Sequence, residues 1–63
     1  MDARDLKEMR SILRRAKEGV EDAVYLLWAH DKAQVRRLKG VAQNLAAEIA
    51  LIDAKLTMLE MGN

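Results

Sequence analysis

Apolar residues recur along the chain at alternating steps of three and four positions. One series runs over residues 6–27 and a second over residues 35–59, and all fifteen positions are apolar. This spacing keeps one stripe of a helix against a neighbouring helix, with side chains inserted as knobs into holes. The pattern therefore predicts an all-α protein with coiled-coil heptad packing. Beside Ala16, Ala23 and Ala42, the stripe contains the residues expected to form the core of an oligomer: Leu6, Met9, Leu13, Val20, Leu27, Val35, Leu38, Leu45, Ile49, Ile52, Leu56 and Leu59.

The two series are separated by an eight-residue step from Leu27 to Val35. Asp31, followed three residues later by Gln34, resembles a capping box, in which the carboxylate accepts from the free N–H groups of a new helix and the glutamine reaches back. We therefore expect an antiparallel two-helix hairpin in a single domain, 1–63, with helix one at about 2–29, a turn at about 29–31 and helix two at about 32–61. One long helix with a skip residue is the alternative, since the turn has neither glycine nor proline.

The ends of the helices have their own signals. Asp2 and Asp5 are candidate caps at the start of helix one, where side-chain oxygens accept from free N–H groups. Gly62 and Asn63 suit the end of helix two, where a left-handed residue often closes the last turn. Between these ends, the hairpin predicts the facing pairs Leu27–Val35, Val20–Ala42, Leu13–Ile49 and Leu6–Leu56.

Two helices alone cannot enclose this stripe, because one side of the seam between them stays open to water. Further apolar or small residues widen the stripe: Ile12, Gly19 and Leu26 on one flank of helix one, Val24 on the other, and Val41 and Ala46 on helix two. A stripe this wide is typical of a bundle helix. We therefore expect two hairpins to form a homodimeric four-helix bundle.

The composition leaves association as the main support for so short a chain. A chain of 63 residues buries a small fraction of its surface, and without cysteine it has no disulfide or thiolate metal site. The single histidine, His30, cannot build a zinc site alone. Ser11 and Thr57, the only hydroxyl nucleophiles besides Tyr25, lack a nearby histidine in the expected hairpin. We expect no enzyme activity, no metal and no cofactor.

The charge pattern does not indicate a particular class of partner. The net charge is +1, no run of eighteen apolar residues could span a bilayer, and the start MDARDLKEMR does not resemble a signal peptide. We expect a cytoplasmic protein without membrane contact. Two basic clusters, Arg10–Lys17 and Lys32–Lys39, are interrupted by acidic residues on helix one, and their candidate nucleic-acid contacts are Arg10, Arg14, Arg15, Arg36 and Arg37.

Apolar residues outside the stripe are candidates for binding another protein. The far side of helix two repeats Gly40, Ala47, Ala54 and Met61 at seven-residue spacing, flanked by Leu51 and Met58. Alanine is the best helix former, which explains part of this pattern; a partner helix approaching closely is the other interpretation. Tyr25 and Trp28 either cover the turn or anchor a partner. The predicted partner surface is thus Tyr25, Trp28, Ala47, Leu51, Ala54 and Met58.

In length and layout the chain resembles the Rop family of plasmid copy-number regulators, whose hairpins pair into a four-helix bundle. The resemblance covers the heptads and a turn near residue 30, while no RNA-contact signature of that family can be placed here. It implies an RNA- or DNA-binding bundle. A similar likeness to helical-hairpin co-chaperones of secretion systems and to small phage proteins implies a structural subunit of an assembly. Ahead of both, the apolar helix faces favour a protein–protein interaction module, as adaptor, regulator or inhibitor.

Overall fold

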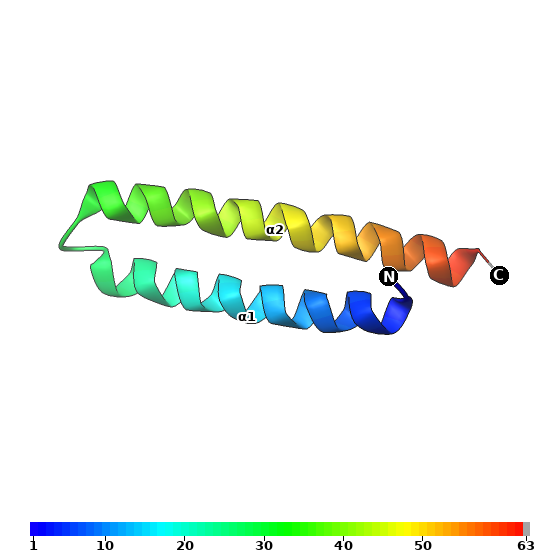
Figure 1. Ribbon diagram of the computed structural model, residues 1–63. Helices are drawn as coiled ribbons and strands as arrows, with labels where there is room; N and C mark the ends of the chain where they lie inside the picture. Colours follow the sequence, from blue (N-terminus) through cyan, green and yellow to red (C-terminus); the bar gives the residue numbers. More distant parts are fainter. Residues whose placement is uncertain (63) are drawn as a thin grey trace.

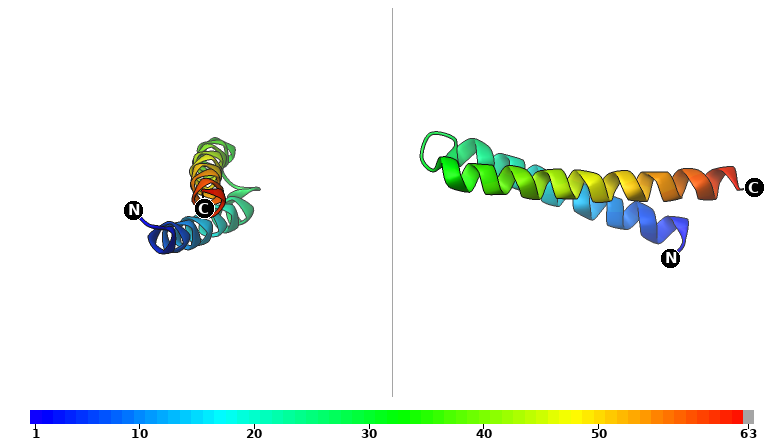
Figure 2. Two further views of the ribbon diagram at one scale, coloured as in Figure 1. Left: turned by 90° about the vertical axis from the view of Figure 1, so that its right-hand side faces the viewer. Right: turned by 90° about the horizontal axis from the view of Figure 1, so that it is seen from above.

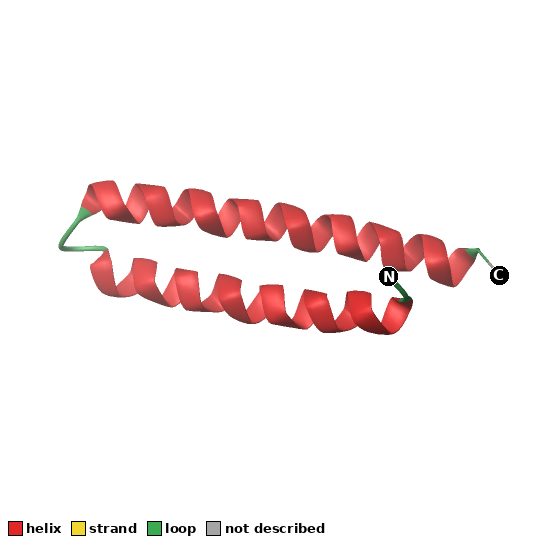
Figure 3. Ribbon diagram, in the orientation of Figure 1, coloured by secondary structure: helices red, strands yellow, loops and turns green. Residues whose placement is uncertain are grey.

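The chain folds into two long helices joined by a short connection. A computed structural model describes residues 1–62, in which helix α1 spans Ala3–Leu27 and helix α2 spans Lys32–Met61. Figure 1 shows the helices side by side with both chain ends at one end of the molecule, so they run antiparallel. The described part of the chain has no strand, and Figure 3 shows loop only between the helices and at the ends. The all-α hairpin is confirmed, and the single long helix is wrong.

Aspartates begin both helices. Asp31 is extended, with φ −145°, and its carboxylate accepts from the N–H of Gln34 at 3.0 Å. Asp2 accepts in the same way from the N–H of Asp5 at 2.9 Å. The N–H of Asp31 donates to the carbonyl of Leu27 at 3.1 Å, so it is already used within the connection. The carboxylate half of the predicted capping box is therefore present, whereas the reciprocal contact from the Gln34 side chain is not among the bonds of the described residues.

The predicted end of helix one and the predicted closure of helix two differ from the structure, whereas the predicted end of helix two at about residue 61 agrees with it. α1 ends at Leu27, two residues before the expected end, because Asp31 must be extended to cap α2 and the chain must therefore leave the first helix within one turn. At the other end, Gly62 caps α2 with a right-handed φ of −72°, and its N–H donates to the carbonyl of Met58 at 2.9 Å. The left-handed closure expected at Gly62 is absent, since this bond continues the helical ladder. Asn63 lies outside the described residues.

The apolar stripe lines the seam between the helices but is only partly enclosed. Leu6, Ile52 and Leu56 form a buried cluster near the chain ends, in agreement with the predicted facing of Leu6 and Leu56, and Val35 is buried near the connection. These four are the only buried side chains among residues 1–62. Most other stripe positions are half-buried, and Leu59 is exposed. Figure 2 shows the helices crossing obliquely, and residues 1–62 contain no third helix that could cover the seam.

Candidate interaction surfaces

Charged side chains line one side of the seam. The guanidinium of Arg10 donates to the carboxylate of Asp53 at 2.7 Å, which links α1 to α2. Lys7 and Glu60 approach to 3.9 Å across the same seam, and both are largely exposed. An exposed pair of this kind contributes about 0–1 kcal/mol, and the short, half-buried Arg10 pair lies toward the upper end. We call this side, defined by Lys7, Arg10, Asp53 and Glu60, the ion-pair flank.

Arg10 has a structural partner that the sequence analysis missed. Its position at the start of a basic cluster predicts a nucleic-acid contact. In the structure its side chain is 28% exposed and bonded to Asp53. The predicted facing of Leu6 with Leu56 could have revealed the pair, because it places Arg10 beside Asp53 one turn further along the seam. Arg10 therefore helps to hold the hairpin together.

The opposite side of the seam carries apolar residues. A step of two residues turns a helix by about 200°, which puts Ile12 across the stripe from Arg10. Ile12, Gly19 and Leu26 follow one another along this flank at seven-residue spacing. We call this side the open face; its defining members are Ile12, Gly19, Leu26, Val41, Leu51 and Leu59. Its five large side chains are 44–73% exposed, so a large amount of apolar side-chain surface on this side is in contact with water.

A groove on the open face joins residues that the sequence analysis had assigned separately. Met9, a predicted core residue, and Leu51, a predicted partner residue, both line it, with Glu48 and Lys55 at its edge. Leu51 therefore belongs to the open face rather than to a separate surface. Met58, seven residues further along α2, is exposed on the same flank of this helix.

The remaining predicted partner residues do not form one surface with Leu51. Ala47 and Ala54 are exposed on the outward side of α2, away from α1. Tyr25 is 82% exposed on α1, and Trp28 lies at the end of that helix. The six residues of the predicted surface are thus spread over both helices and over different sides of the hairpin.

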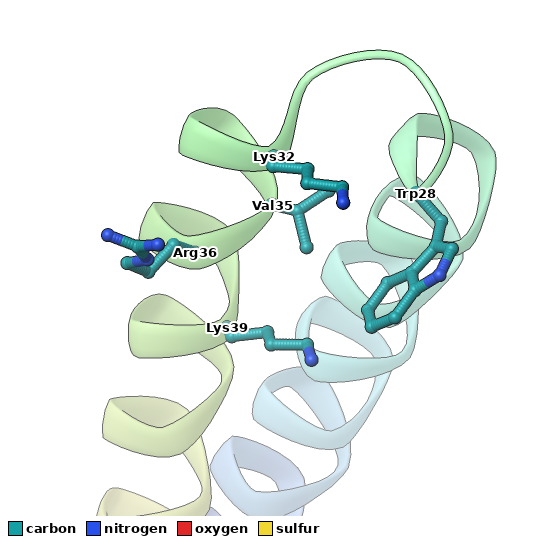
Figure 4. Close-up of a pocket in the computed structure, with 5 residues that line it drawn as sticks. All are labelled: Trp28, Lys32, Val35, Arg36 and Lys39. Atoms are coloured by element: carbon teal, nitrogen blue, oxygen red, sulfur yellow. The ribbon is translucent and has the colours of Figure 1, made fainter.

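Trp28 and a group of cations form a pocket beside the connection. The Nζ atom of Lys39 lies 4.3 Å from the centre of the Trp28 ring, a cation–π contact between the helices. Lys32, Val35, Arg36 and Lys39 line a space of about 290 Å³ beside this ring. Figure 4 shows the side chains of Lys32 and Lys39 extending toward Trp28, whereas the side chain of Arg36 points away from it. No ion pair within residues 1–62 involves these three cations. Trp28 thus contacts α2 beside the connection, and an electropositive pocket lies next to this contact.

The other predicted nucleic-acid contacts point in different directions. Arg14 and Arg15, and likewise Arg36 and Arg37, are all exposed, but successive residues of a helix point about 100° apart. Arg36 lines the Trp28 pocket and Arg37 does not. The arginines therefore form no single basic face.

The structure gives no sign of a metal centre or a membrane span in the described residues. Within residues 1–62 no three histidine, cysteine or acidic side chains gather as metal ligands would. Neither described helix has a stretch of the length and apolarity that crossing a bilayer requires. The molecule is a two-helix hairpin with ion pairs on one side of the seam and exposed apolar side chains on the other. No protein-family model, curated protein or solved structure matches this chain.

Proposed function

We propose that this hairpin is a non-enzymatic protein–protein interaction module that dimerises through its open face into a four-helix bundle. The observation that carries the proposal is the contrast between four buried side chains and five large apolar side chains exposed together on the open face. Soluble monomers rarely expose contiguous apolar surface on this scale unless it binds something. A second hairpin supplies the missing half of the core, and the heptad spacing on both helices already suits bundle packing.

The size of the open face suits a second copy. The Cα atoms span 51 × 14 × 13 Å. One long face therefore offers roughly 700 Å² in projection, close to the 800 Å² or so that each partner buries in a stable interface. The ion-pair flank is a poorer choice, because burying Arg10 and Asp53 under a second chain would remove their remaining water without adding a partner.

The test compares two neighbouring residues of α1. Leu26→Glu places a charge within the proposed interface, whereas Tyr25→Glu places the same charge on the outward side of the helix. We expect the native chain and Tyr25→Glu to sediment as dimers and Leu26→Glu to sediment as a monomer, all at one protein concentration. Circular dichroism checks that each variant is helical. A native chain that sediments as a monomer at every concentration would refute the proposal.

Dimerisation through the open face leaves the Trp28 pocket uncovered for a further partner. The ammonium groups of Lys32 and Lys39 favour an acidic protein surface, and the Trp28 ring offers a rigid contact of the kind that often dominates interface energies. The module would then act as an adaptor or regulator: the open face builds the dimer, and the pocket at each end selects the second protein.

Binding of nucleic-acid phosphates is a second candidate function, favoured by the same pocket. Lys32 and Lys39 extend toward the aromatic ring of Trp28, and phosphate contacts of this kind weaken steeply as salt rises. Electrophoretic mobility shifts with structured RNA and duplex DNA at low salt test it. Retention that falls with salt and is weakened by Lys32→Gln, with the exposed Lys55→Gln as the matched control, would favour this function; no retention at low salt would end it.

A further inference from the structure

Between residues 12 and 26, the exposed flank of α1 has the same apolar pattern in both directions from Gly19, and Asp5, one repeat earlier, is polar. Ile12 and Leu26 lie seven residues to either side of Gly19, and all three occupy one side of the helix. A two-fold axis crossing the helix at Gly19 would place Ile12 of one copy against Leu26 of the other, and Gly19 against Gly19. A symmetric dimer interface needs self-complementarity of this kind.

The corresponding flank of α2 has a different character. It comprises Gln34, Val41, Glu48 and Lys55, so that three of its four residues are polar. If α1 lay beside α2 of the second copy, Ile12 and Leu26 would be buried against this polar flank. If each helix lies beside its own counterpart, the apolar flank meets an apolar flank and the polar flank meets a polar one. The second arrangement avoids burying unpaired polar groups.

Charges next to these flanks fit the same axis. Arg15 precedes Gly19 by four residues and Asp22 follows it by three, so the axis brings Arg15 of one copy close to Asp22 of the other. Both side chains are exposed, and neither takes part in an ion pair within residues 1–62. On α2, Arg37 and Glu48 lie on either side of the segment that faces Gly19, and both are also exposed. Each chain thus carries both halves of two complementary charge pairs.

Gly19 permits a close approach at the axis. A Cβ atom built on Gly19 meets nothing within 4 Å in the hairpin, so the interior of the single chain does not require glycine here. Two helix backbones can come closest where side chains are missing. Gly40 on α2 has equally open surroundings but points away from the flank, and it serves as a comparison.

From these observations we propose that two copies pair about a two-fold axis crossing α1 at Gly19, so that α1 packs antiparallel against α1 of the second copy and α2 against α2. The inference rests on the proposed dimer and adds its symmetry, its neighbours and its central residue. It makes the second copy of this chain the specific occupant of the open face.

Single cysteines test the position of the axis directly, because the chain has no cysteine of its own. A disulfide requires Cα atoms within about 7 Å. We expect Gly19→Cys to form a covalent dimer on mild oxidation. Ile12→Cys, on the same flank, should not, because its two copies would be about 21 Å apart along the helices. In the rival arrangement, a mixture of Gly19→Cys and Val41→Cys chains would give the mixed dimer instead.

Charge reversal gives a second test that does not alter Gly19. Arg15→Asp should weaken the dimer roughly three- to tenfold, because it places two acidic residues together at each of two symmetric positions. Adding Asp22→Arg should restore the affinity. The two residues lie about 10 Å apart along one helix, so they cannot restore each other within a single hairpin.

The outcomes separate the two proposals. Dimeric mass with a Gly19 cross-link and charge rescue supports both. Dimeric mass with no Gly19 cross-link and no rescue overturns the axis while leaving the dimer intact. Monomeric mass for the native chain overturns the dimer and the axis together.

Discussion

At the scale of single residues, Asp31 decides where the second helix begins. Its carboxylate satisfies a free N–H group of α2 and carries negative charge at the positive end of the helix dipole. We expect Asp31→Ala to lower the free energy of unfolding by about 1 kcal/mol, as loss of an N-cap typically does. Urea unfolding followed by circular dichroism measures the change. Glu18→Ala, an exposed acidic residue in the middle of α1, is the control and should be nearly neutral; an equal loss in both variants would contradict the capping role.

The sequence predicted some residue roles and missed others for identifiable reasons. Asp31 was predictable because capping depends on local spacing alone. The Arg10–Asp53 bond and the contact of Lys39 with Trp28 join residues far apart in the chain. Such contacts depend on the rotation of each helix about its axis. A side chain next to the apolar stripe faces either the seam or the solvent, depending on that rotation. The heptads define the stripe but not which long side chains reach across it.

At the scale of the helices, two glycines allow a matched comparison. Gly19 and Gly40 both lie inside a helix, and a Cβ atom at either meets nothing within 4 Å. Alanine at such a site usually stabilises a helix by about 1 kcal/mol relative to glycine. We expect this full gain from Gly40→Ala and a smaller gain, or a loss, from Gly19→Ala, whose methyl group must fit between two copies of α1. Urea unfolding at one protein concentration tests this. Equal gains would show that no helix approaches Gly19 closely.

The helix boundaries show how far local signals extend. The predicted start of α2 agrees with the structure because Asp31 marks it, and both helices follow the heptads closely. The predicted end of α1 is two residues too late, since Trp28, Ala29 and His30 have no helix-breaking side chain. The requirement that ends α1 comes from the following helix: Asp31 must be extended before α2 can start. A boundary set by the next element is hard to see in the residues that precede it.

At the scale of the whole molecule, the open face makes stability depend on association. A single hairpin with four buried side chains has little to offset the entropy of ordering two long helices. If two hairpins fold together, unfolding also separates the chains, and each tenfold rise in protein concentration favours the folded dimer by about 1.4 kcal/mol.

We therefore expect the midpoint of thermal unfolding, followed by circular dichroism, to rise steadily with concentration for the native chain and for Tyr25→Glu. Leu26→Glu should unfold at a lower temperature that does not change with concentration. A native midpoint independent of concentration would mean that each hairpin is stable alone, and the exposed open face would then need a different explanation.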